Sequence, residues 1–96
     1  MSPNDTRIET TVVVRNKNGL HARPSSLLAE TALRFADTSI TLRRNDTVVD
    51  AKSIMELLLL EATCGTELHL SADGPQAGNA VDELKRLFER EFDVKL

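Results

Sequence analysis

The 96-residue chain is poor in cysteine and in large aromatic side chains: it has one cysteine, three phenylalanines, no tyrosine and no tryptophan. A lone Cys64 cannot form an internal disulfide, so we expect a protein of a reducing, cytoplasmic compartment. We expect no signal segment, because no charged-then-apolar stretch opens the sequence, and the longest apolar run, residues 57–60, is far too short to cross a bilayer. Two histidines and one cysteine offer no spacing of metal ligands, so we expect no metal.

Charge and aromatic content argue against nucleic acid as a partner. Residues 1–52 contain 8 basic and 6 acidic side chains, and residues 53–96 contain 4 and 9, so neither half resembles a phosphate-backbone footprint. An RNA-recognition domain would need aromatic side chains on its sheet to stack bases. In this sequence all the aromatic residues lie on or near segments with helical periodicity: Phe35, Phe88 and Phe92. Because none is expected on the sheet, the sequence does not fit an RNA-recognition domain.

The periodicity of apolar residues predicts seven elements in the order β-α-β-β-α-β-α. We expect strands at residues 8–15, 39–44, 47–49 and 66–72. Helices are expected from residue 22 to about 36, from Ser53 to the Cys64–Gly65 pair, and over residues 77–92, with Val94 continuing the last apolar series. This order predicts an α+β fold in which helices cover one face of an antiparallel or mixed sheet. The chain reads as a single domain, 1–96, with residues 1–7 as a loose N-terminal segment.

His21 lies in the connection between the first expected strand and the first expected helix, directly before the helix begins. The first N–H groups of a helix have no intrahelical acceptor, and the helix dipole is positive there, so an anion on the His21 ring would be stabilised. Arg23 can add a charge-assisted contact, and Pro24 is tolerated because its missing N–H costs no helical bond. Gly19 permits a sharp turn. Asn18 could form a hydrogen bond with a phosphoryl group on the His21 ring, or with the ring nitrogen that does not carry this group. The plain alternative is a histidine that merely precedes a helix.

Two motifs carry a family resemblance. Residues 18–24 (NGLHARP) and residues 51–55 (AKSIM) resemble those of the HPr proteins of the phosphoenolpyruvate-dependent phosphotransferase system, and the resemblance extends from about residue 8 to residue 92. It implies an open-faced β-sandwich, a four-stranded antiparallel sheet with three helices on one face. It also implies that His21 is phosphorylated at Nδ1 by Enzyme I and passes the group to an EIIA-type protein. Arg23 would stabilise the phosphate, with Ala22 among the supporting residues of the motif.

The resemblance further implies a carrier that is not itself an enzyme. Such a protein needs no cofactor, because the partner enzyme supplies the metal and the chemistry. We expect a monomer with no membrane and no nucleic-acid partner. A hydrolytic alternative is weak, since no Ser-His-Asp or Cys-His set is visible, and Cys64 is expected to be a buried filler at a helix end. His69, between Leu68 and Leu70, is expected to face solvent without a chemical role.

Ser53 has two interpretations. In the purely structural interpretation, Ser53 and Glu56 form a capping box. The Ser53 hydroxyl accepts a hydrogen bond from the Glu56 amide, and the Glu56 carboxylate accepts one from the Ser53 amide. By resemblance, a serine at this place is in some HPr proteins the target of an HPr kinase/phosphorylase. Glu56 departs from the glycine or lysine usual in the family, and a carboxylate there would repel a phosphate on Ser53 and compete for the same amides. Regulation through Ser53 therefore stays open.

The helix that Ser53 opens is apolar nearly all round. We place Leu57 and Leu60 in the core, while the alternative is that all its apolar side chains pack inward. An exposed apolar patch on a small protein usually marks a docking surface. The residues expected in such a patch are Ile54, Met55, Leu58 and, from the first helix, Leu27. Within the family, an NPr-type or other regulatory carrier without a role in sugar uptake is the alternative function.

Overall fold

The computed structural model describes residues 7–93 and contains the expected order of elements. The strands are β1 (Arg7–Val13), β2 (Ser39–Arg44), β3 (Thr47–Asp50) and β4 (Glu67–Asp73). The helices are α1 (Ala22–Leu33), α2 (Ile54–Leu59) and α3 (Ala77–Glu89), followed by a short 3₁₀ turn, η1 (Glu91–Asp93). Within residues 7–93, no helix has both the length and the apolar character needed to cross a membrane.

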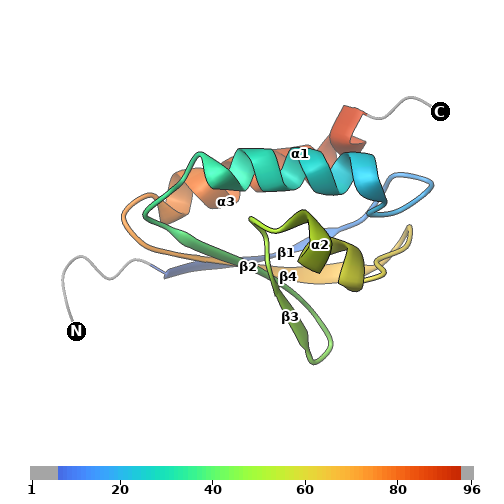
Figure 1. Ribbon diagram of the computed structural model, residues 1–96, viewed down its shortest axis with the longest axis horizontal. Helices are drawn as coiled ribbons and strands as arrows, with labels where there is room; N and C mark the ends of the chain where they lie inside the picture. The colour runs from blue at the N-terminus through green and yellow to red at the C-terminus, as the bar shows by residue number, and fades with distance from the viewer. Residues whose placement is uncertain (1–6, 94–96) are drawn as a thin grey trace.

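The four strands form one antiparallel sheet in the order β1-β4-β2-β3. β4 is paired on both sides, so Leu70 lies opposite Thr10 of β1 and Leu42 of β2. The three helices all cover the same face of this sheet, with α1 and α3 side by side (Figure 1). The prediction of an α+β open-faced sandwich with an antiparallel sheet is confirmed.

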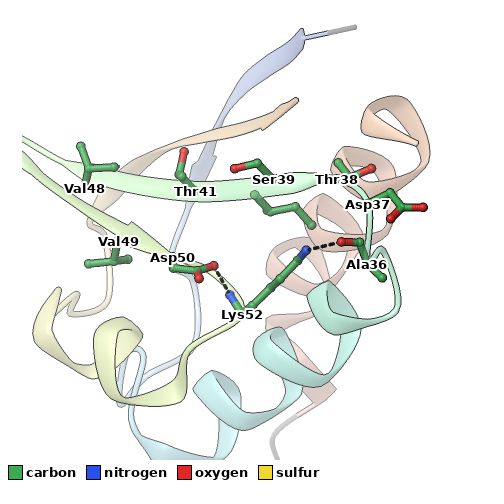
Figure 2. A pocket seen from close by; sticks show the side chains of 10 residues that line it. Ala36, Asp37, Thr38, Ser39, Thr41, Val48, Val49, Asp50 and Lys52 are labelled. Carbon is green, nitrogen blue, oxygen red and sulfur yellow. Dashed lines mark hydrogen bonds between the residues drawn. The ribbon is translucent and has the colours of Figure 1, made fainter. Parts of the chain in front are cut away.

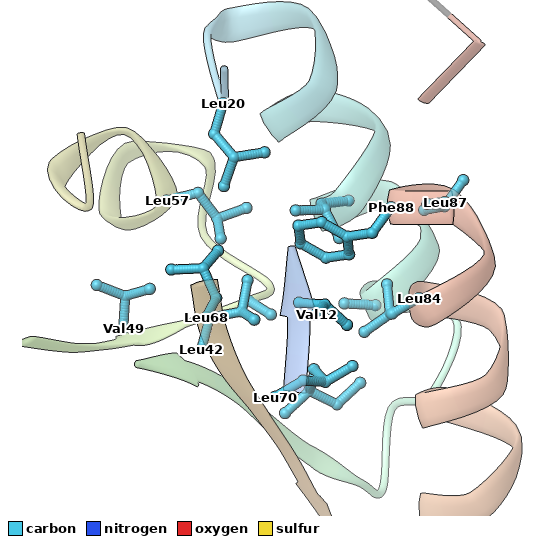
Figure 3. Close-up of a cluster of buried hydrophobic side chains, with 14 of the residues drawn as sticks. Val12, Leu20, Leu42, Val49, Leu57, Leu68, Leu70, Leu84, Leu87 and Phe88 are labelled. Carbon is cyan, nitrogen blue, oxygen red and sulfur yellow. The ribbon is translucent and has the colours of Figure 1, made fainter. Parts of the chain in front are cut away.

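The core fills the space between the sheet and the helices, as Figure 3 shows. Alternate residues of β1, β2 and β4 point into it, among them Val12, Leu42 and Leu70, which are at most 4% exposed. α3 contributes an apolar stripe at helical spacing, ending in Phe88, whose ring packs edge-to-face against Phe92 with 4.9 Å between centroids. A continuous core of this kind fixes the positions of the loops that connect its elements.

Several expected boundaries were wrong. Arg7 belongs to β1, so the expected loose segment is at least one residue too long; residues 1–6 and Val94 lie outside the described residues. α1 ends at Leu33, which is 57% exposed, and Ala36 is exposed beyond it, so neither belongs to the apolar side of a continuing helix. The last helix stops at residue 89, and Phe92 reaches the core with a positive φ of 58°.

The second helix was also predicted too long. α2 ends at Leu59, five residues before Cys64, because Glu61 takes a left-handed φ of 50°. The carbonyl oxygens left free at this end accept hydrogen bonds from Nη1 of Arg44, at 2.9 Å for Leu60 and 3.2 Å for Glu61. This contact joins α2 to a strand distant in sequence, and local periodicity does not predict it.

Candidate functional site

His21 is the N-cap residue of α1. Its backbone is extended (φ −81°, ψ −170°), and its carbonyl oxygen accepts the Ser25 N–H at 3.0 Å, the first bond of the helix. The His21 side chain makes no capping hydrogen bond to α1, and the first turn of the helix contains no acidic residue. Because Pro24 has no N–H, the amides left without an intrahelical acceptor belong to Ala22 and Arg23. The first turn therefore has unused hydrogen-bond donors and a positive dipole end beside the His21 ring.

The two nitrogens of the half-buried His21 ring are not equivalent. Nε2 is closed off from solvent and has no hydrogen-bond partner among residues 7–93. Burial disfavours attack by Nε2, and the family resemblance implies Nδ1 as the nitrogen that is phosphorylated.

The loop before His21 is held by the segment that follows α2. Val14 N donates to Thr66 O at 2.9 Å, and Gly65 N donates to Val14 O at 2.7 Å. Leu20 N donates to Ala62 O at 2.9 Å. These three backbone bonds fix the loop between β1 and α1 on a segment that lies 42 to 52 residues further along the chain.

Gly19 is required at this contact. Its φ is +70°, and a Cβ placed there would meet the Ala62 carbonyl oxygen and lie 2.9 Å from the Thr63 Cα. The expectation of a sharp turn at Gly19 was correct, but its close approach to the chain after α2 was not foreseen. The residue allows the two backbones to touch and thereby sets where His21 begins its helix.

Arg23 and Asn18 are both exposed, and neither side chain forms a hydrogen bond with another described residue. By contrast, Pro24 and Ser25 are buried, and Ser25 Oγ donates to Leu20 O at 3.3 Å. The helix start is thus anchored by its buried side chains, while Arg23 is free to turn toward a bound anion.

Asn16 is a feature of the site that the sequence analysis treated only as part of a turn. It is 3% exposed, its carbonyl oxygen accepts Gly19 N at 3.1 Å, and its Nδ2 donates back to Gly19 O. The sequence places Asn16 five residues before His21 but contains no signal that its side chain is buried.

Ser53 and Glu56 form only half of the expected capping box. Ser53 Oγ accepts from Glu56 N at 3.2 Å, as predicted. Glu56 Oε1 accepts from the Asp50 amide at 3.0 Å rather than from Ser53, whose own N–H donates to Asp50 O. The prediction that Glu56 competes for the amides at the start of α2 is therefore wrong, because its carboxylate is held one turn earlier in the chain.

The exposed apolar face of α2 is present. Leu57 and Leu60 are buried, as expected, at 0% and 2% exposed. Leu27 on α1 is half-buried and packs against the core, so it does not add a freely exposed apolar side chain. Leu59, which the sequence analysis did not single out, is 69% exposed and belongs to it. The α2 patch thus consists of Ile54, Met55, Leu58 and Leu59, between 37% and 76% exposed.

A groove of about 570 Å³ lies at the far end of α1 from His21, between the β2–β3 hairpin and the residues after the helix (Figure 2). Lys52 reaches across its wall and donates to Phe35 O at 2.9 Å and to Ala36 O at 3.5 Å. That ammonium group places a positive charge just beyond the C-terminal end of α1, where the helix dipole is negative. Since α1 is 12 residues long, the groove is separated from the histidine by the whole helix, about 18 Å.

Two expectations away from the site need correction. His69 is not without a chemical neighbour, because its Nε2 lies 2.6 Å from Glu9 Oε1 on the adjacent strand. His69 and then Arg7 lower the pKa of the Glu9 carboxyl by hydrogen bonding to it. Cys64 is exposed rather than buried, and its Sγ lies 3.6 Å from Arg15 O. The hydrogen-bond partners of His69 and Cys64 are thus Glu9 and Arg15, and not His21.

With this geometry described, comparisons with known proteins identify the family. The model of the PTS HPr component phosphorylation site matches residues 8–90. The chain is 43% identical to phosphocarrier protein HPr of Treponema pallidum, over 86% of this chain and 93% of that protein. It is 36% identical to phosphocarrier protein NPr of Klebsiella oxytoca, over 90% and 96%. A crystal structure of HPr-C-His from Thermoanaerobacter tengcongensis superposes with a TM-score of 0.87 at 37% identity, covering 93% of this chain and 99% of that one.

An antiparallel open-faced sandwich with a histidine at the start of its first helix defines the class of small phosphocarrier proteins. The chain belongs to the HPr family of the phosphotransferase system. Members of this family carry phosphoryl groups and are not themselves enzymes.

Proposed function

We propose that this protein accepts a phosphoryl group from phospho-Enzyme I on Nδ1 of His21 and passes it to an EIIA-type protein. The observation that carries the proposal is the position of His21 at the N-terminus of α1, where its Nε2 is buried and the first turn contains no acidic residue that would repel a phosphoryl group. The Nδ1 lone pair forms the new N–P bond while the bond from phosphorus to the donor breaks and its electron pair leaves with the donor. The two free amides and Arg23 stabilise the charge that arrives.

The proposed function is tested by mixing the protein with phosphoenolpyruvate and candidate Enzyme I proteins. Intact mass spectrometry should then show the addition of one phosphoryl group per chain. A subsequent addition of the cognate EIIA-type protein should remove it. Failure to label with every Enzyme I of the source cell would refute the proposed donor.

We expect Arg23→Ala to slow phosphoryl transfer while leaving the fold intact. Arg23 is exposed and makes no hydrogen bond to another described residue, so its removal should change stability by less than about 0.5 kcal/mol. Loss of one charge-assisted contact to the phosphate, worth about 1.5–3 kcal/mol, should reduce the transfer rate roughly 10- to 100-fold. Rapid-quench kinetics beside a thermal melt measure both quantities. Normal transfer with a large loss of stability would show that Arg23 serves the fold instead.

The α2 patch is proposed as the surface on which both partners dock. We expect Met55→Glu, at a side chain 76% exposed, to leave the melting temperature close to wild type. Binding to Enzyme I should weaken by about tenfold or more, because the interface loses apolar area and must desolvate a charge. Titration calorimetry measures the affinity, and Val48→Glu, on β3 and 57% exposed, is a matched control away from the patch. Equal weakening by both variants would contradict the assignment.

Ser53 is proposed to be a poor substrate for an HPr kinase/phosphorylase, if the cell has one. Two carboxylates adjoin it in the chain: Glu56 accepts from the Asp50 amide, and Asp50 Oδ1 accepts from the Lys52 amide at 2.9 Å. A phosphate on Ser53 would add like charge to this pair. We therefore expect Glu56→Gly to be phosphorylated several-fold faster than wild type in a radiolabel assay. Equal rates would remove the electrostatic explanation and leave Ser53 as a helix cap.

An NPr-type or other regulatory role, without sugar uptake, is the alternative. The match to both an HPr and an NPr over most of the chain supports either branch. Transfer rates measured against a sugar-specific and a nitrogen-type Enzyme I would distinguish them.

A further inference from the structure

Two buried side-chain atoms lack a hydrogen-bond partner among residues 7–93, and both belong to the loop that carries the histidine. They are Asn16 Oδ1 and His21 Nε2. Buried polar atoms are nearly always paired, so each unpaired atom calls for a physical explanation. The amide oxygen can only accept a hydrogen bond, whereas the ring nitrogen donates whenever it carries the proton. The two atoms are therefore chemically complementary.

Asn16 is held against the turn that leads into His21. Its backbone carbonyl and its Nδ2 both bond Gly19, two residues before the histidine, and its side chain is 3% exposed. Because Nδ2 is committed to Gly19 O, the free oxygen of the same amide is the atom that remains for another partner. Asn18, by contrast, is exposed and does not bond the ring.

We propose that Asn16 is a positioning residue for His21: its Oδ1 accepts a hydrogen bond from His21 Nε2–H after a torsional change of the His21 side chain, while Asn16 Nδ2 stays bonded to Gly19 O. This inference rests on the proposed phosphoryl transfer through Nδ1 and deepens it. With the proton fixed on Nε2, the Nδ1 lone pair is free, and it is this pair that forms the N–P bond. Nε2 keeps its proton through the transfer, so the ring itself neither gains nor loses one.

The alternative role for Asn16 is only to brace the loop through Nδ2. The two roles use different atoms of one amide, and a substitution can separate them. Asn16→Asp keeps an accepting oxygen and loses the Nδ2 donor, whereas Asn16→Leu loses both. Asn18→Leu is the matched control, because it makes the same change two residues away at an exposed position.

The experiment is long-range ¹H–¹⁵N NMR of the unphosphorylated protein, at a pH high enough for both histidines to be neutral. Wild type should show His21 mainly as the Nε2–H tautomer. Asn16→Leu should reduce the ratio of Nε2–H to Nδ1–H by about fivefold, the population change expected from one net hydrogen bond. Asn16→Asp and Asn18→Leu should keep the wild-type preference. His69 should not change in any variant, because its partner is Glu9.

Several outcomes would overturn the proposal. A wild-type ratio in folded Asn16→Leu would show that Asn16 does not pair with the ring, and a change in Asn18→Leu alone would assign the role to Asn18. If Asn16→Asp changed the tautomer ratio as Asn16→Leu does, Asn16 would act only by holding the loop through its Nδ2 donor. Should Asn16→Leu not fold, the wild-type spectrum still decides, since a predominant Nδ1–H tautomer is incompatible with the proposal. All these measurements are made without a phosphoryl donor, so they stand apart from the test of Enzyme I.

Discussion

His21→Ala should abolish phosphoenolpyruvate-dependent labelling of this protein. The substitution removes the nitrogen that would form the N–P bond. The first turn of α1 offers no replacement, because Arg23 is a cation and the Ser25 hydroxyl is buried and bonded to Leu20 O. His21 is half-buried and makes no side-chain hydrogen bond to cap the helix, so its loss should leave the fold stable. Intact mass after incubation with phosphoenolpyruvate and Enzyme I provides the measurement.

His69→Ala is the matched control for this experiment. It removes the other histidine of the chain, on β4, and with it the bond to Glu9 at 2.6 Å, but should leave labelling at the wild-type level. The label on wild type should be lost in acid and retained in alkali, as expected of a labile P–N bond. Labelling that persists in His21→Ala would end the assignment of the carrier residue.

Gly19→Ala should cause the largest loss of stability among substitutions near the site. The added Cβ would meet the Ala62 carbonyl oxygen and the Thr63 Cα, both backbone atoms that cannot move aside alone. A residue with a Cβ is also strained at a φ of +70°. From the two effects together we expect the free energy of unfolding to fall by about 3 kcal/mol, which lowers the melting temperature by roughly 10–20 °C. Differential scanning calorimetry measures both.

Gly65 allows the strain and the close contact to be separated. Its φ is also positive, at +94°, but a Cβ there would have nothing within 4 Å. Gly65→Ala should therefore show only the cost of backbone strain, about 1 kcal/mol. If the two variants melted at the same temperature, the contact between the His21 loop and the chain after α2 would have no energetic significance.

Elements and their order were predictable because they depend on local patterns. The β2–β3 hairpin follows from alternating Ile40 and Leu42 and the Asn45–Asp46 turn, and its strands begin and end where they were expected to within one residue. The burial of Leu57 and Leu60, with the exposure of Ile54 and Met55, follows from the fact that a single short helix has only one inner side.

What the sequence did not predict depends on contacts between distant segments. α2 was extended to Cys64 because nothing local marks its end at Leu59; the carbonyls there are bonded by Arg44, far away in the chain. The partner of Glu56 proved to be the Asp50 amide, which the bend between β3 and α2 brings within reach. The burial of Asn16 likewise requires knowing that the chain after α2 covers its loop.

The three backbone hydrogen bonds that tie the His21 loop to residues 62–66 have a kinetic consequence. Residues 62–66 follow closely after α2, so the backbone bonds connect the α2 patch to the ring of His21, the proposed phosphorylation site. A partner that docked on the patch would meet the ring at a set distance and angle, and attack on phosphorus would become effectively unimolecular, with a high effective molarity. Because the same arrangement would face donor and acceptor in turn, one geometry would serve both directions of the relay. The amides of Leu20 and Gly65 should accordingly exchange with deuterium as slowly as those of the central sheet.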